Sequence, residues 1–322
     1  MGYAQDGLMK ANEALKAIEA SQKFTLPQDD RMIAIDAAQK FTLAQDAWMT
    51  SIEAAQRFAL AQDKMILMVW DQATYYPLPV LIKNSSGKKV LINNLFQSPE
   101  VIDFLWQHFV LLKIDDDSYP ALYEDIKNRS FTYKGKFDDD SLKVMDANGN
   151  ILNTSLNTEY VLDLTVLINK YALNTSYLKQ ELLNYRKERT FYTTLYLASR
   201  YVEFGFYTHS SIRPEIIDLS SIYINEARVL MTRDSLDNKA ALEQRLELLD
   251  IEQSLVLNKP KKVIRRLKRF KEEELQGANK PFLAFMYFTA YRLLRDEKNA
   301  AVWRSKISSV DFDKAMFIIN SR

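Results

Sequence analysis

The sequence predicts a central α/β domain between two helical regions. Two short apolar runs, Ile66–Val69 and Phe109–Ile114, have the length and composition of buried strands. A 17-residue repeat precedes them, and helical periodicity without strand signals fills the C-terminal half. We therefore expect helical repeats over residues 1–49, the α/β domain over 50–155, and a helical domain over 156–322.

Composition favours helix and excludes several kinds of chemistry. Glycine occurs only 7 times in 322 residues, and glycine costs about 1 kcal/mol in a helix interior. Cysteine is absent, which rules out disulfides, thiolate nucleophiles and cysteine-ligated metal sites. Because His108 and His209 are the only histidines, we expect no multi-histidine metal site. We also expect no cofactor. With 43 basic and 42 acidic residues, no overall charge favours nucleic acid.

No transmembrane segment is expected in this sequence. The longest apolar run, Phe282–Tyr291, is too short for a bilayer, which requires about 20 residues. It predicts a buried helix instead. The first residues, Met1–Asp6, lack the basic start and apolar core of a secretory leader, so none is expected within this chain.

The repeat consists of three segments that start at Lys16, Ile33 and Thr50 and share Ile, Gln, Phe, Leu and Asp at equivalent positions. Each segment predicts a short helix, because it is rich in Ala, Gln and Lys or Arg. Thr50 and Glu53 predict a capping box at the start of the third helix. The repeats form either an interaction arm or a duplicated helix that extends the edge of the domain.

The central region reads as helix, strand, helix, strand, short helix, strand, hairpin and strand. Ser98-Pro99-Glu100 has the cap, proline and early acid of a helix start, and that helix leads into the run at Phe109. Ser141–Met145 predicts a third strand. Asn148-Gly149 predicts a two-residue hairpin after it.

Three stretches of this region resemble the thioredoxin-like domains of extracytoplasmic proteins from Bacteroidetes-type bacteria. They are Ser51–Leu67, Leu95–Asp115, and the D-A-N-G-N turn at Asp146–Asn150, where the family has D-x-D-G. The resemblance covers about a third of the chain. It implies a mixed sheet with helices on both faces, a periplasmic location, and a helical C-terminal region of the kind common in such proteins.

On this alignment, Tyr75-Tyr76-Pro77-Leu78 occupies the family's C-x-P-C position. The family's activity depends on a cysteine thiolate that attacks a disulfide. Tyrosine, with an ordinary pKa of about 10, cannot replace it. The family's cis-proline position falls near Asp140, where a cis Asp–Asp peptide would cost about 3 kcal/mol. The resemblance therefore implies a domain that is redox-inactive and not an enzyme.

The same resemblance suggests an interaction surface. Trp70, Tyr75, Tyr76 and Leu78 are expected to form an exposed tip at the end of the first strand, and aromatic side chains dominate protein interfaces. In the alternative interpretation, both tyrosines pack beneath the inserted segment Val80–Asn93.

Two kinds of charged run need an explanation. Asp115–Asp117 and Asp138–Asp140 lack the spacing of a calcium loop, so we expect them to be solvated strand ends. Eight basic residues lie within 259–271. Four of them are expected to share one helical face that is solvated or binds an anionic ligand: Lys262, Arg265, Arg266 and Arg269.

In the C-terminal half, Phe191, Leu195, Ala198 and Val202 predict one buried helical face. Proline-containing breaks divide this half into six or seven expected helices, arranged as a bundle or a TPR-like array of helical hairpins. The breaks fall at Pro214, at 258–260 and at 277–281.

The function expected from these observations is binding or scaffolding of another protein, whose identity stays open. One alternative is an anionic ligand or surface bound through residues 259–271, with peripheral membrane contact, and its binding would weaken steeply with salt. The other is an enzyme with an unrecognised site, for which a pocket of carboxylates with shifted pKa values would be the sign.

Overall fold

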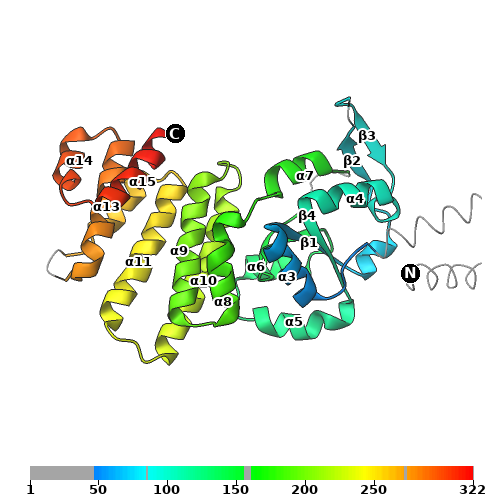
Figure 1. Ribbon diagram of the computed structural model, residues 1–322, viewed down its shortest axis with the longest axis horizontal. Helices are drawn as coiled ribbons and strands as arrows, with labels where there is room; N and C mark the ends of the chain where they lie inside the picture. The colour runs from blue at the N-terminus through cyan, green and yellow to red at the C-terminus, as the bar shows by residue number, and fades with distance from the viewer. Residues whose placement is uncertain (1–46, 85, 156–160, 272–273, 322) are drawn as a thin grey trace, which may run out of the picture. The chain divides into compact units, whose positions relative to one another are not determined.

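The computed structural model describes residues 47–84, 86–155, 161–271 and 274–321 (Figure 1). They divide into two compact units, which meet in the sequence between Asn174 and Thr175. The first unit is mixed α/β with two small mixed sheets, and the second is helical. The first repeat and the second as far as residue 46, with the proposed interaction arm, lie outside the described residues.

The first unit is built around a four-stranded sheet with the order β4-β1-β5-β6. β1 runs parallel to β4 and antiparallel to β5, and β5 runs antiparallel to β6. The two apolar runs thus form buried strands, as predicted, and the structure shows that they are neighbours. The strands are β1 (Met65–Trp70), β4 (Phe109–Ile114), β5 (Lys143–Met145) and β6 (Ile151–Thr154).

Both faces of β1 are buried. Its six residues are at most 3% exposed, and successive side chains of a strand point to opposite faces, so packing covers both. α3 (Ile52–Gln62) packs on β1 and β4, and α4 (Pro99–His108) packs on β4. Two further helices precede β5: α5 (Tyr119–Ile126) and α6 (Phe131–Asp138).

The cap of α3 differs from the sequence prediction. Ser51, not Thr50, is the N-cap, and its hydroxyl accepts a hydrogen bond from the backbone N–H of Ala54 at 3.2 Å. Adjacent hydroxyl residues compete for this role, and the backbone conformation decides between them. Asp63 ends the helix in the left-handed conformation, with φ of 55°. The end of the third repeat unit is therefore a helix end, as expected.

The turn between β5 and β6 is longer than the two-residue hairpin predicted. Asp146 is fully buried, and one carboxylate oxygen accepts hydrogen bonds from the N–H groups of Asn148 at 2.9 Å and Asn150 at 2.8 Å. Gly149 has a φ of +87°, which side chains disfavour. The carboxylate therefore organises a five-residue connection, 146–150.

We expect Asp146→Ala to lower the free energy of unfolding by about 1 kcal/mol, because two N–H groups lose their acceptor. Asp146→Asn should retain most of the stability, since an amide oxygen can accept the same bonds. Urea titration of the full chain measures both values. Equal losses in the two variants would mean that the charge, and not the hydrogen bonding, supports the turn.

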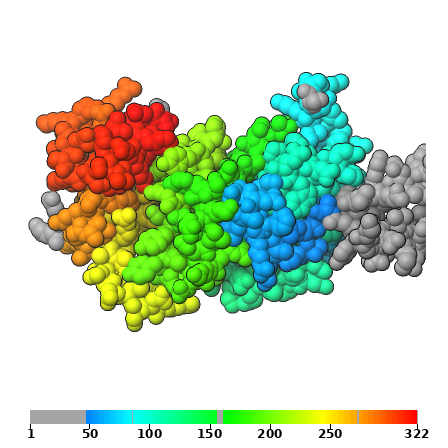
Figure 2. All heavy atoms as spheres, in the orientation of Figure 1, coloured from blue at the N-terminus to red at the C-terminus, as the bar shows by residue number. Residues whose placement is uncertain are grey.

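The inserted segment Val80–Asn93 forms a hairpin that projects from the first unit (cyan in Figures 1 and 2). It belongs to a second sheet with the order β3-β2-β7, in which β2 pairs antiparallel with β3 and parallel with β7. The first unit ends with α7 (Leu164–Tyr171), whereas the sequence assigned residues from 156 onward to the helical region. The strands are β2 (Val80–Lys83), β3 (Lys89–Ile92) and β7 (Leu162–Asp163).

The second unit is a succession of helices, of which α8 to α13 each pack on the next in the chain and α15 packs on α13. No helix among the described residues has both the length and the apolar character needed to cross a bilayer. The helices are α8 (Lys179–Lys187), α9 (Phe191–Tyr207), α10 (Arg213–Arg233), α11 (Lys239–Val256), α12 (Pro260–Leu267), α13 (Lys280–Leu293), α14 (Glu297–Arg304) and α15 (Ser309–Asn320).

The sequence predicted much of this unit correctly. The face of Phe191, Leu195, Ala198 and Val202 is buried in α9, and α13 is the buried helix expected over Phe282–Tyr291. Prolines occupy the first turns of α10, α12 and α13. The expectation of six or seven helices was too low, because α14 and α15 begin at polar caps without a proline.

A buried ion cluster holds α15 against the rest of the unit. The Lys314 ammonium from α15 lies 2.9 Å from Glu252 of α11 and 3.0 Å from Glu203 of α9. Glu252 is fully buried, and its Oε2 has no hydrogen-bond partner among the described residues. Burial alone lowers the pKa of Lys314, but the two carboxylates outweigh this and raise it. Lys314 therefore compensates a charge that water cannot reach.

Candidate functional site

The residues after β1 form a fixed turn at the carboxyl end of the parallel pair β1 and β4. Asp71 follows β1 and is paired with Lys113 of β4 at 2.8 Å. It accepts a hydrogen bond from the Tyr75 hydroxyl at 2.7 Å, across the short helix η1 (Gln72–Tyr75). Burial alone would raise the pKa of the Asp71 carboxyl, but the bonds from Lys113 and Tyr75 hold it below its ordinary value.

Tyr75 and Tyr76, which we call the tyrosine tip, project from this turn. They are 67% and 74% exposed, so they do not pack beneath the inserted segment. Pro77 is also exposed and Leu78 is half-buried. The backbone of Leu78 is fixed by the side chain of Asn94, whose amide oxygen accepts its N–H at 3.3 Å.

Trp70 does not belong to this surface, and its predicted exposure was wrong. It is 3% exposed, and its indole N–H donates to the carbonyl of Phe137 at 3.3 Å. The ring also contacts Tyr119, with centroids 5.8 Å apart. The position is the last of a strand buried on both faces, and α5 and α6 supply the aromatic contacts that the sequence pattern does not reveal.

Lys143 lies beneath the segment that contains Asp140. Its side chain is buried in β5, and its ammonium donates to the carbonyls of Asp139 and Ser141 and lies over the Trp70 ring. Burial lowers the pKa of Lys143 to about 8, although the nearby aspartates oppose the shift. Asp140 itself is exposed, and no peptide bond among the described residues is cis.

An acidic rim surrounds this edge of the sheet, and we define it as Asp115–Asp117 and Asp138–Asp140. The charge of Asp116 acts on both the Tyr75 hydroxyl and the Lys143 ammonium, which places the two runs around one edge. The hydrogen bond to Asp71 and the charges of Asp71, Asp115 and Asp116 raise the pKa of Tyr75. The tyrosine tip therefore stands in a negative electrostatic environment.

The acidic rim has local structural roles. Asp115 caps a short helix through the N–H of Asp117 at 3.0 Å, and Asp116 accepts from the N–H of Gln72 at 2.9 Å. Asp138 accepts from the hydroxyl of Tyr119 at 2.6 Å, and this bond, together with burial and the charge of Asp138, raises the pKa of Tyr119 to about 12. Within the described residues, no three acidic or histidine side chains converge to hold a metal ion.

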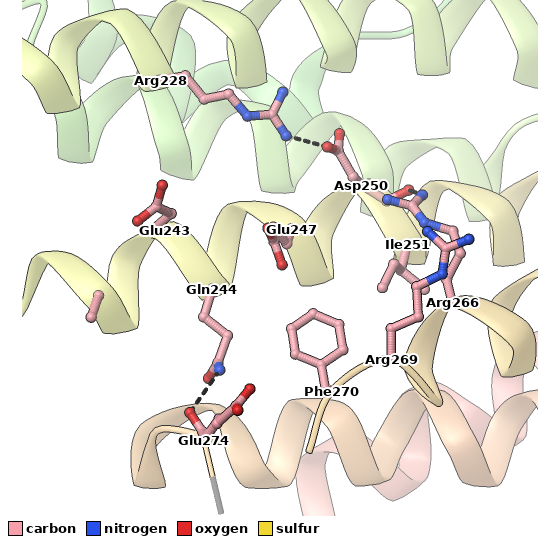
Figure 3. A pocket seen from close by; sticks show the side chains of 11 residues that line it. Arg228, Glu243, Gln244, Glu247, Asp250, Ile251, Arg266, Arg269, Phe270 and Glu274 are labelled. Carbon is pink, nitrogen blue, oxygen red and sulfur yellow. Dashed lines mark hydrogen bonds and ion pairs between the residues drawn. The ribbon is translucent and has the colours of Figure 1, made fainter. Parts of the chain in front are cut away.

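The basic segment 259–271 does not form one continuous helical face. α12 ends at Leu267, so Arg269 follows the helix, and Arg266 donates to the carbonyl of Asp250 at 2.9 Å. Arg266 and Arg269 line a groove of about 610 Å³ in the second unit (Figure 3). Lys262 and Arg265 are exposed and do not line it. The sequence missed the helix end because no glycine or proline marks it.

The groove also contains acidic residues, so it is a charged groove of both signs. Glu243, Glu247 and Asp250 of α11 line it together with the two arginines, and Asp250 is paired with Arg228 of α10. Sequence analysis did not identify these acids. The signal was present in the four-residue spacing of Glu243 and Glu247, which places both on one side of a helix.

The two histidines have ordinary surroundings. His108 ends α4 and lies edge-on to Phe104, and burial together with the charge of Lys64 lowers its pKa. His209 lies within hydrogen-bond distance of the Ser211 hydroxyl, at 2.9 Å. Neither lies beside a nucleophile and an acid in the arrangement of a catalytic triad among the described residues.

The sequence analysis missed Asp71 and Lys113, which hold the turn of the tyrosine tip, and Lys143 beside Trp70. A lysine inside the predicted strand Ser141–Met145 was the available signal for a buried ammonium, but its acceptors are backbone carbonyls, which carry no sequence pattern. Comparison of the chain with protein-family models, curated proteins and solved structures finds no match.

Proposed function

We propose that the first unit is a thioredoxin-like domain without redox activity, and that it binds another protein through the tyrosine tip. The order of helices and strands in the described part of the unit supports the fold, since it contains the expected elements in sequence, with the β2–β3 hairpin inserted after β1 and two helices in place of the single short helix before β5. Thiol–disulfide exchange has no nucleophile in a chain without cysteine. Binding is the function that such a domain can retain.

The observation that carries the proposal is the exposure of two adjacent tyrosines on a turn held rigid by hydrogen bonds. Large aromatic side chains on a fixed backbone lose little conformational entropy on binding, and tyrosine is enriched at interface hot spots. The same side chains on a mobile loop would lose more conformational entropy on binding. The bonds from Tyr75 to Asp71 and from Leu78 to Asn94 keep both ends of this turn in place.

The acidic rim defines the chemistry of the partner. A segment with lysine or arginine beside apolar side chains would meet complementary charge around the tyrosine tip, whereas an acidic segment would be repelled. We therefore propose a basic segment of another protein as the partner. Its binding should weaken as ionic strength rises, because the rim is exposed to solvent.

The test compares the full chain with the variant Tyr75→Ala/Tyr76→Ala as bait for proteins of its source cell. At least one partner should be lost from the variant, and its affinity should fall about tenfold or more, as is typical of hot-spot residues. Isothermal titration calorimetry with the recovered partner measures the affinity. If both baits recover the same partners, the proposal is contradicted.

A matched control is available on α9, where Tyr192 and Tyr196 are also exposed, at 40% and 59%. Tyr192→Ala/Tyr196→Ala removes the same chemical groups from the second unit and should leave the affinity unchanged. Equal loss in both variants would mean that tyrosines of any location bind non-specifically.

A second candidate is an anionic ligand at the basic segment, but two observations reduce its support. Arg266 uses one N–H group on the carbonyl of Asp250, and the groove that Arg266 and Arg269 line contains carboxylates that would repel a purely anionic ligand. Of the four basic residues expected to share one face, Lys262 and Arg265 are the two that are exposed on α12 and lie outside the groove. For the second unit as a whole, we propose a TPR-like scaffold of helical hairpins, because consecutive helices pack on one another.

A further inference from the structure

We infer that the charged groove binds a ligand that combines a carboxylate with a basic side chain. This chemistry is offered by the C-terminal arginine or lysine of a peptide, and by the free amino acid. The groove belongs to the second unit alone, so the inference is independent of the tyrosine tip. Its volume of about 610 Å³ accommodates a ligand of this size.

The acidic side of the groove is formed by α11. Glu243 and Glu247 are exposed, and neither carboxylate makes a hydrogen bond or ion pair with another described residue. Their spacing of four residues places them one turn apart on the helix. They are therefore available to a guanidinium or ammonium group, which carries several donors.

The basic side comes from the region where α12 ends. Arg269 is exposed and has no side-chain partner among the described residues. Arg266 uses one terminal nitrogen on the carbonyl of Asp250, which fixes the guanidinium and leaves its other N–H groups available. A guanidinium binds a carboxylate through two parallel hydrogen bonds, and a fixed donor loses less entropy when it does so.

Phe270 lines the groove together with both sets of charged residues. In Figure 3 its ring is seen below Glu247 and beside Arg269. The aliphatic part of an arginine or lysine side chain can pack on such a ring while its charged end reaches a carboxylate. The groove thus offers a contact for the ligand's carboxylate, for the aliphatic part of its side chain and for the charged end of that side chain.

The rest of the groove is already held in position. Arg228 pairs with Asp250, and the Gln244 amide donates to the carbonyl of Glu274 at 3.3 Å. A purely anionic ligand would approach Glu243 and Glu247 unfavourably, and a purely cationic one would approach the arginines unfavourably. Charges of both signs in one groove therefore favour a ligand that also carries both.

The test is calorimetric titration of the full chain at low ionic strength with four probes. They are acetyl-Gly-Gly-Arg with a free carboxylate, the same peptide as its C-terminal amide, acetyl-Gly-Gly-norleucine with a free carboxylate, and L-arginine. The first peptide should bind about tenfold tighter than the amide or the norleucine peptide, since each lacks one charge-assisted contact. L-arginine binding more tightly than the peptide identifies the free amino acid as the ligand, and the reverse identifies a peptide C-terminus.

Variants place the binding in the groove. Arg269→Gln and Glu247→Gln should each weaken the first peptide about tenfold. Arg265→Gln, which removes an exposed arginine of α12 outside the groove, should have no effect. The inference is overturned if none of the probes binds, if the amide binds as well as the free acid, or if Arg265→Gln weakens binding as much as Arg269→Gln. Circular dichroism confirms that each exposed substitution leaves the fold intact.

Discussion

Replacement of Lys314 by methionine should destabilise the second unit by about 3–5 kcal/mol, because it leaves a buried carboxylate without its counter-ion. Glu252 is fully buried, and Lys314 is the cation paired with it at 2.9 Å. Methionine keeps much of the volume of the lysine stem and removes the charge. A unit of this size should melt roughly 10 °C lower, which scanning calorimetry of the full chain measures.

The same variant makes a specific prediction about pH. Burial raises the pKa of Glu252 above its ordinary value of 4.5, and loss of the Lys314 ammonium raises it further. The folded variant then binds a proton more tightly than the unfolded chain. The protonated Glu252 contributes its full share of stability below pH 4.5, and that contribution is lost as pH rises through the raised pKa. Lys314→Met should therefore lower the free energy of unfolding less at pH 5 than at pH 8.

Two controls separate the ion pair from general effects. Lys261→Met, at an exposed position of α12, should change stability by less than about 0.5 kcal/mol. The double variant Lys314→Met/Glu252→Gln should recover part of the loss, with a coupling energy of about 1–3 kcal/mol. Strictly additive losses would mean that Lys314 supports α15 by packing and not by charge.

The second large effect is expected at Gly205 in α9, where α9 and α11 approach closely. A Cβ atom at this position would lie 2.7 Å from Cγ1 of Val256, which is closer than carbon atoms tolerate. Alanine normally stabilises a helix interior by about 1 kcal/mol relative to glycine. We expect the clash to reverse that sign, so that Gly205→Ala destabilises by about 1–3 kcal/mol.

The clash can also be relieved by shortening Val256, the side chain that the new Cβ atom would meet. Val256→Ala alone should destabilise by leaving a small cavity, but the pair Gly205→Ala/Val256→Ala should be more stable than the sum of the single changes predicts. Gly135 of α6 is the matched control, since a Cβ there meets no atom within 4 Å. Gly135→Ala should stabilise by up to about 1 kcal/mol. Urea denaturation of the four variants decides between the outcomes, and stabilisation by Gly205→Ala would contradict the close approach.

The strands of the first unit could be predicted because their signal is local. Ile66–Val69 and Phe109–Ile114 are continuous apolar runs, and such runs are strongly favoured as central strands of a covered sheet. The exposure of Tyr75 and Tyr76 agrees with one of two interpretations that the sequence left open, the exposed tip suggested by the family resemblance. Trp70 was predicted to be exposed but is buried, because the aromatic residues that cover it come from α5 and α6, which are distant in the sequence.

The sequence by itself determined that this protein has no thiol chemistry, that its central region alternates helices and strands, and that its C-terminal half is helical. These properties depend on composition and on periodicity along the chain. Only the tertiary structure decided where these charges lie: Lys314 against Glu252, Lys143 against the backbone carbonyls of 139 and 141, and Arg269 and the acids of α11 on the walls of one groove. Such pairings depend on how separate helices pack, and packing is set by contacts between residues far apart in the chain.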